Sequence, residues 1–146
     1  MNITIKPLLT ARALTLVTLI GLLGMFSRQS LAEDQTISLV ASECAVTVTP
    51  NEGSGCEQGQ CEGVEACICA KRGDFITWEM SDNNRAKFKL KFSENSPLKE
   101  QCGKNFKKGK VKCKVKEELD VGESFDYLVM LEGCDEGTDP RIVISK

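Results

Sequence analysis

Apolar and polar residues alternate through most of the chain after residue 32. Between residues 86 and 92, alanine, phenylalanine and leucine alternate strictly with lysine, and a similar alternation returns at 110–116. This period of two is typical of strands with one buried and one solvated face. No segment after residue 32 carries a helical stripe over three turns. The predicted strands are 36–40, 45–49, 64–70, 75–80, 86–92, 110–116, 125–131 and 141–145. About eight short strands, separated by turn signals, predict an all-β sandwich or small barrel.

Residues 51–65 interrupt this rhythm. They contain four glycines, Cys56 and Cys61, and no aromatic residue. We expect an irregular excursion that is tied down by disulfides rather than another pair of strands.

The first 32 residues have the organisation of a leader. Lys6 and Arg12 precede a run of 14 apolar, glycine and threonine residues, and Ser30-Leu31-Ala32 follows it. The run is shorter than the roughly 20 residues that cross a bilayer, and the small residues suit cleavage after Ala32. We expect residues 1–32 to be a signal peptide, with an uncleaved membrane anchor as the alternative. Residues 33–146 then form one domain, without a membrane span, in the periplasm or outside the cell.

Eight cysteines all lie after the predicted leader. An even number in a short exported chain predicts a disulfide framework. Cys102 and Cys113 flank a glycine- and lysine-rich loop, and we expect them to pair. Cys67 and Cys69 point to the same face of a strand, so each is expected to pair elsewhere. Their candidate partners are Cys44, Cys56, Cys61 and Cys134.

Charge is distributed unevenly along the chain. Residues 33–69 carry seven acidic and no basic side chains, residues 70–116 carry 14 basic and five acidic ones, and 117–146 carry nine acidic and two basic ones. The central block could bind an anionic surface, a glycan or a protein partner; its lysines could equally form solvated strand faces that block edge-to-edge pairing. Nucleic acid is not expected, because Phe106 is the only aromatic residue in 104–116. The candidate anion-binding residues are Lys104, Lys107, Lys108, Lys110, Lys112 and Lys114.

The second half of the chain resembles exported bacterial cupredoxin-like domains. The likeness rests on four motifs in order: Lys71-Arg72-Gly73-Asp74-Phe75-Ile76-Thr77-Trp78, the segment 88–98, the glycine-led strand 122–129 with its tyrosine, and Asp139-Pro140-Arg141-Ile142-Val143-Ile144. It implies a Greek-key β-sandwich of seven to eight strands, stabilised here by disulfides. It does not imply a copper site, because Val129 stands where the copper cysteine would follow the tyrosine strand.

The chain contains no histidine. Type 1 copper needs two imidazoles and a thiolate, and imidazole-based nucleophilic catalysis and histidine-ligated zinc are excluded for the same reason. A pair of carboxylates could still act as acid and base on a glycoside, but with 21 acidic residues some pair lies close by chance. We expect no enzymatic activity and no bound cofactor.

Two functions of different class remain. The first is a non-enzymatic exported binding or accessory module. The second is a protein that binds Cu(I) or Zn through sulfur, which suits these ions, although disulfides compete for the same residues. A third, weaker hypothesis is thiol–disulfide exchange at Cys67-Ile68-Cys69. The sulfur ligands of the second hypothesis would be Cys56, Cys61, Cys67 and Cys69 with Met80 or Met130.

Overall fold

A computed structural model describes residues 34–51, 56–57, 59–81 and 86–146. The predicted signal peptide, residues 1–32, lies outside this range. The elements are β1 (Asp34–Ser42), β2 (Ala45–Pro50), β3 (Cys67–Ala70), β4 (Phe75–Met80), β5 (Lys87–Phe92), the 3₁₀ turn η1 (Lys99–Gln101), β6 (Lys107–Lys108), β7 (Lys110–Lys114), β8 (Ser124–Leu131), β9 (Gly137–Thr138) and β10 (Arg141–Ile144). Within the described residues, no helix has the length and hydrophobicity needed to cross a membrane.

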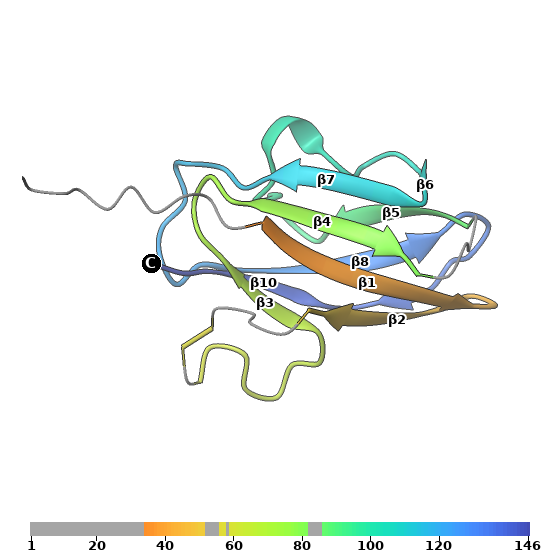
Figure 1. Cartoon of the computed structure of the whole chain (residues 1–146), viewed down its shortest axis with the longest axis horizontal. Coiled ribbons are helices and arrows are strands. Elements are labelled where there is room, and N and C mark those ends of the chain that lie inside the picture. Colours follow the sequence, from red (N-terminus) through yellow and green to blue (C-terminus); the bar gives the residue numbers. More distant parts are fainter. Residues whose placement is uncertain (1–33, 52–55, 58, 82–85) are drawn as a thin grey trace, which may run out of the picture.

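The strands form two packed sheets (Figure 1). The first has the order β2-β1-β4-β7, and the second has the order β3-β10-β8-β5-β6, with β9 paired to β8. The pairs β1–β4 and β3–β10 are parallel, and the other strand pairs are antiparallel. The chain passes from one sheet to the other between β2 and β3, β3 and β4, β4 and β5, β6 and β7, and β7 and β8. The predicted all-β, Greek-key β-sandwich is therefore confirmed.

A tryptophan and a tyrosine meet at the centre of the sandwich. Trp78 on β4 and Tyr127 on β8 are almost fully buried. The Trp78 Nε1–H donates a hydrogen bond to the Tyr127 hydroxyl over 3.0 Å, and the two rings meet edge to face. Burial raises the pKa of Tyr127 above its ordinary value, so the hydroxyl stays neutral. The pair thus joins the two sheets by packing and by a hydrogen bond.

The predicted start of β3 differs from the observed one. The alternation predicted a strand over 64–70, whereas β3 begins at Cys67. Ala66 adopts φ +54°, in the left-handed region that a strand cannot accommodate. The chain therefore turns into β3 only at Cys67. The two-residue strands β6 and β9 are too short for a periodic pattern to predict.

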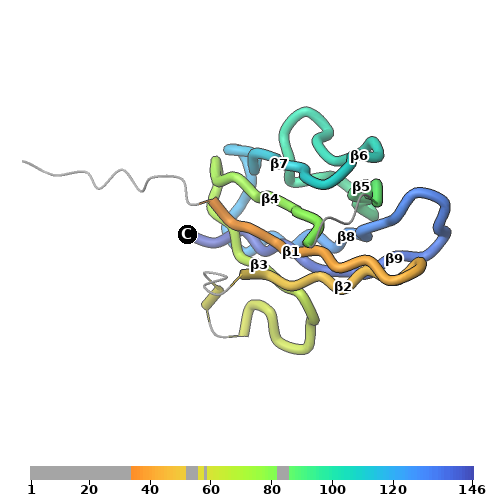
Figure 2. The backbone as a smooth tube through the Cα atoms, turned by 45° about the vertical axis from the view of Figure 1, so that its right-hand side comes forward, coloured from red at the N-terminus to blue at the C-terminus, as the bar shows by residue number. Residues whose placement is uncertain are grey.

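The described residues of the excursion between β2 and β3, 56–57 and 59–65, pack against the outer face of β3 and β10. Ile68 and Ala70 of β3 point into the main core, whereas Cys67 and Cys69 form a second apolar cluster with Val143 of β10. Partly buried residues of the excursion pack against this cluster. They are Cys56, Cys61 and Val64. Figures 1 and 2 show residues 59–65 lying beside β3, away from the interface between the sheets.

An ion pair crosses from β8 to β10. The Arg141 side chain donates hydrogen bonds of 2.6 and 3.1 Å to the two oxygens of Asp126. The two residues are directly paired in register. The hydrogen bond from Arg141 lowers the pKa of Asp126 below its ordinary value.

This pair is expected to make stability depend on pH. Because the pKa of Asp126 is lower in the folded state, its contribution is complete above about pH 4, the ordinary range of aspartate, and is lost as pH falls through the folded value. We expect about 0.5–1 kcal/mol, since both side chains are partly exposed. Urea unfolding measures the free energy of unfolding between pH 5 and pH 2. This free energy should fall less for Asp126→Asn than for the parent protein, by about the same amount. Asp135→Asn is the control, because Asp135 is exposed and forms no ion pair with any described residue. Identical pH profiles for the parent and Asp126→Asn would contradict this prediction.

Candidate anion-binding site

The loop that carries η1 is fastened between β5 and β7. The Cys102–Cys113 disulfide, the pair that the spacing favours, ties it to β7. The Leu90 N–H donates to the Gly103 carbonyl oxygen over 2.8 Å, so the loop also lies against β5.

Gly103 is required at this contact. Its φ is +81°, and a Cβ atom would lie 2.7 Å from the Cδ1 of Leu90. Glu100 and Gln101 also adopt left-handed φ values of +54°. For residues other than glycine this conformation is costly and persists where surrounding contacts impose it, often beside ligand sites. The loop thus lies against β5 with two non-glycine residues in a strained conformation.

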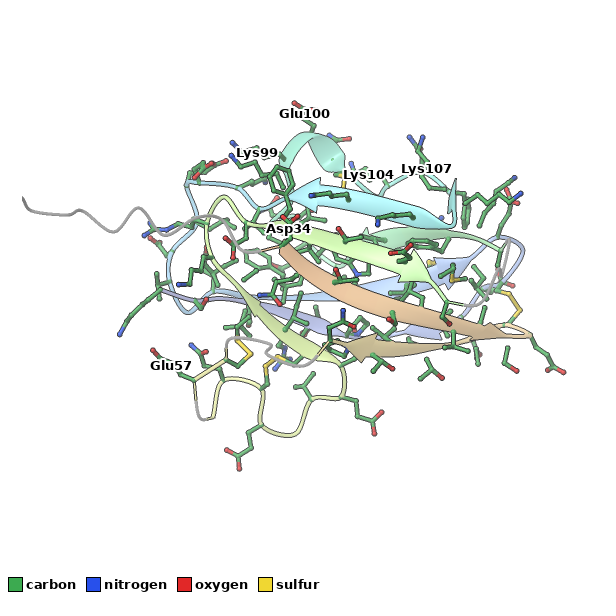
Figure 3. The ribbon with its side chains drawn as sticks, in the orientation of Figure 1. Asp34, Glu57, Lys99, Glu100, Lys104 and Lys107 are labelled. Carbon is green, nitrogen blue, oxygen red and sulfur yellow. A yellow bond between two sulfur atoms is a disulfide. The ribbon has the colours of Figure 1, made fainter. Side chains whose placement is uncertain are left out.

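A surface hollow of about 400 Å³ lies between β5 and this loop; we call it the β5 hollow. Its apolar lining comes from Leu90, Phe92 and Leu98, and two acidic residues, Glu94 and Glu100, also contribute. Figure 3 shows Glu100 and Lys104 on the loop beside β7. Four lysines from three parts of the chain complete the lining: Lys89, Lys91, Lys104 and Lys116.

None of these four lysines forms an ion pair with a described residue. The Lys89 ammonium lies 4.7 Å from the centroid of the Phe106 ring, and the Lys104 ammonium donates to the side-chain oxygen of Gln101 over 2.9 Å. Their charges are therefore not neutralised by direct carboxylate contacts within the described part of the chain. All four residues line the same hollow.

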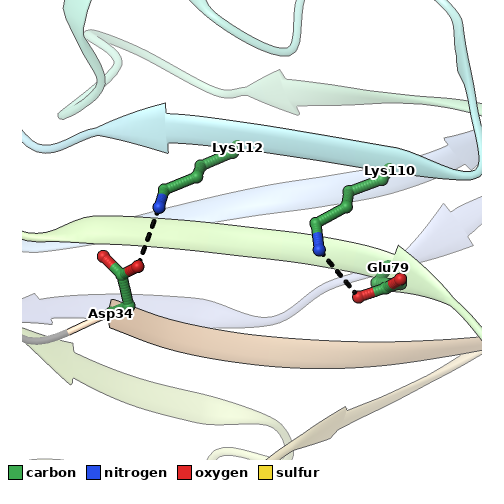
Figure 4. Close-up of polar contacts among 4 residues, drawn as sticks. All are labelled: Asp34, Glu79, Lys110 and Lys112. Carbon is green, nitrogen blue, oxygen red and sulfur yellow. Dashed lines mark hydrogen bonds and ion pairs between the residues drawn. The ribbon is translucent and has the colours of Figure 1, made fainter.

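The lysines of β7 have a different environment. Lys110 pairs with Glu79 at 3.1 Å and Lys112 pairs with Asp34 at 2.7 Å, on the outer face of the first sheet (Figure 4). Lys114 pairs with Glu117 at 2.9 Å. Its hydrogen bond lowers the pKa of Glu117 below the ordinary value.

The candidate patch is therefore divided between two environments. Lys110, Lys112 and Lys114 have carboxylate partners. This environment agrees with the alternative in which these lysines form a solvated strand face and bind no ligand. Lys107 and Lys108 are exposed on β6, and neither forms an ion pair with a described residue. Of the six candidate lysines, only Lys104 lines the β5 hollow.

Lys104 is far in sequence from Lys89, Lys91 and Lys116, its neighbours in the hollow, and no local pattern links them. The alternation in 86–92 does indicate that Lys89 and Lys91 leave the core on one face. It gives no sign that the η1 loop returns to β5 or that Lys116 lies nearby. These relations depend on the Cys102–Cys113 bridge and on the contact between Leu90 and Gly103.

All eight cysteines are paired, so the structure offers no free thiolate. The sulfurs of Cys56, Cys61 and Cys69 nevertheless lie within 4.8 Å of one another. The two methionines of the metal hypothesis lie elsewhere: Met80 belongs to the main core, and Met130 lies on β8. A metal could use these sulfurs only after reduction of the disulfides. The four pairs are Cys44–Cys134, Cys56–Cys69, Cys61–Cys67 and Cys102–Cys113.

Comparison with known proteins gives structural neighbours at low sequence identity. No family model and no curated protein sequence matches the chain. The solved structures similar to it include the human ephrin A2–ephrin A1 complex, at 12% identity, 79% coverage of this chain, 100% coverage of the other and a TM-score of 0.44.

Two structures of the McoA multicopper oxidase from Aquifex aeolicus, one of them a variant, are also similar. Their identities are 18% and 17%, and their TM-scores are 0.36 and 0.35. The matches cover 78% and 77% of this chain but only 30% and 29% of the oxidase chains. Since all three TM-scores lie below 0.5, the assignment of the fold rests on the strand order described above.

Proposed function

We propose that the chain is an exported, non-enzymatic binding module that holds an anionic ligand in the β5 hollow. The observation that carries the proposal is the convergence of Lys89, Lys91, Lys104 and Lys116 on one hollow without carboxylate partners among the described residues. A volume of about 400 Å³ falls in the usual range of ligand pockets.

The chemistry of the lining favours a sulfated or carboxylated glycan over a small inorganic ion. Lysines supply point charges that suit oxyanions, and the partly exposed ring of Phe92 supplies an apolar surface beside them. Glu94 and Glu100 would repel anionic groups at their positions, which restricts where a ligand can place its charges.

Export is supported by two independent features. The first 32 residues have the pattern of a signal peptide, and four disulfides are typical of proteins in oxidising compartments. A binding role without catalysis is supported by the absence of histidine and by Val129, which is fully buried in the core at the position where the family resemblance would require a copper ligand.

Neutralising two lysines of the hollow is expected to weaken glycan binding by at least about 100-fold, because each hydrogen bond to a charged group contributes roughly 1.5–3 kcal/mol. The variant is Lys91→Gln with Lys104→Gln, and binding of heparin fragments is measured by calorimetry at several salt concentrations. Affinity should fall steeply as salt increases.

The matched control is Lys71→Gln with Lys146→Gln, which changes net charge equally at positions outside the lining of the hollow. It should retain affinity within about threefold, since only long-range attraction changes. If both double variants lost the same affinity, binding would be nonspecific electrostatic attraction and the proposed site would be refuted. Failure of the parent protein to bind heparin fragments would refute glycan binding altogether.

A second candidate is the Cys-based Cu(I) or Zn protein, favoured by the clustering of three sulfurs within 4.8 Å. It requires free thiols together with a stoichiometric metal. Intact mass after thiol alkylation, combined with the metal content of protein purified without chelator, separates it from the binding module. Complete disulfide bonding without metal would exclude it.

A further inference from the structure

Two disulfides of the excursion lie in direct contact with each other. Cys56 is bonded to Cys69, and Cys61 is bonded to Cys67. The Sγ atoms of Cys56 and Cys61, which belong to different disulfides, are only 3.1 Å apart. The remaining two disulfides of the chain lie outside this cluster.

The sulfurs differ in their access to solvent. Cys56 and Cys61, on the excursion, are half-buried, whereas Cys67 and Cys69, on β3, are 8% and 1% exposed. An external thiol therefore reaches the excursion side of each bridge more easily than the strand side. Access to the attacked sulfur is one of the factors that set the rate of exchange.

We propose that this cluster is a thiol–disulfide exchange site at which an external dithiol converts two bridges into one different bridge. One thiolate of the dithiol attacks Cys61 and releases Cys67 as a thiolate, which takes up a proton. The second thiolate of the dithiol then displaces Cys61. The external dithiol leaves as a disulfide, and Cys61 is left reduced.

The contact between Cys61 and Cys56 directs the next step. The Cys61 thiolate attacks the Cys56 sulfur, a Cys56–Cys61 bond forms, the Cys56–Cys69 bond breaks, and Cys69 leaves as a thiolate that takes up a proton. The Gln60 Oε1 lies 3.4 Å from the Cys69 sulfur, where it can accept a hydrogen bond from the new thiol. Overall, one dithiol is oxidised and one of the two protein disulfides is reduced.

The exchange changes what holds the excursion in place. Before it, two bridges fasten the excursion to β3, over the outer cluster that includes Val143. After it, the single bridge from Cys56 to Cys61 lies within the excursion, and β3 carries two thiols. Exchange with a dithiol would thereby release the excursion from the sheet.

The sequence allows the product to be identified. Cleavage after glutamate at positions 57, 62 and 65 puts Cys56, Cys61 and the Cys67/Cys69 pair on three different fragments. The parent protein is treated with one equivalent of dithiothreitol, alkylated, and digested near pH 4, where thiols are protonated and exchange stops. We expect most singly reduced protein to contain the Cys56 fragment linked to the Cys61 fragment, with both β3 cysteines alkylated. Singly reduced protein in which Cys56–Cys69 persists and Cys61 and Cys67 are alkylated would overturn the proposal.

A variant tests the same step without reductant. Cys67→Ser leaves Cys61 as a thiol beside the Cys56–Cys69 bond. Attack of Cys61 on Cys56 frees Cys69 in a fraction of the molecules, so alkylation is expected at Cys61 in some molecules and at Cys69 in others. Cys113→Ser is the matched control, because it frees Cys102 outside the cluster, and alkylation there should be confined to Cys102. Alkylation of Cys67→Ser at Cys61 alone would show that the contact does not support exchange.

Discussion

Replacing Cys44 and Cys134 together with alanine is expected to lower the free energy of unfolding by about 4–5 kcal/mol, the largest effect of any single disulfide in the chain. This bridge joins residues 90 positions apart, from the β1–β2 turn to the segment after β8. In the chain-entropy account, a longer closed loop restricts the unfolded state more strongly. Guanidinium unfolding of the folded, purified variant measures the loss.

The control is Cys102→Ala with Cys113→Ala, whose bridge spans only 11 positions. Its removal should cost about 3 kcal/mol on the same account. A loss for this pair equal to or greater than that for Cys44 and Cys134 would contradict the loop-length explanation.

Truncation of Trp78 to alanine is expected to lower the free energy of unfolding by about 3–5 kcal/mol. Trp78 is fully buried and contacts Tyr127 across the two sheets. Part of the loss comes from the cavity and part from the hydrogen bond to the Tyr127 hydroxyl. Urea unfolding of the variant tests this expectation, and a loss below 1 kcal/mol would contradict it.

A smaller variant separates the hydrogen bond from packing. Tyr127→Phe leaves the Trp78 N–H buried without its acceptor, which should cost about 1–3 kcal/mol. Adding Trp78→Phe removes the donor as well, so the double variant should lose less than the sum of the two single losses. Additive losses would show that the hydrogen bond contributes little.

The strands could largely be predicted from the sequence because one face of each is buried. The alternating lysines of 86–92, for example, identify β5 with little dependence on its neighbours. The start of β3 could not be predicted, because the left-handed conformation of Ala66 leaves no trace in the hydrophobic pattern. The parallel pairing of β1 with β4 could not be predicted from a local hydrophobic pattern either, because β2, the excursion and β3 lie between the two strands in the sequence.

The candidate site was less predictable than the fold. Lys112 and Asp34 are 78 positions apart, and only the sheet order brings them into an ion pair. The lysines can therefore be counted from the sequence, but which of them have carboxylate partners cannot be predicted from it. The Cys102–Cys113 bridge could be predicted from the sequence because it closes a local loop. The contact between Cys56 and Cys61, by contrast, depends on how the excursion folds over β3.

The most direct test of the binding proposal is an amide NMR titration of the oxidised protein with a sulfated oligosaccharide. We predict chemical-shift changes concentrated at Lys89, Lys91, Lys104 and Lys116 and in the loop around η1, while the paired lysines of β7 change little. Changes concentrated on the outer face of β7, or no saturable change anywhere, would contradict the proposal that the β5 hollow binds an anionic glycan.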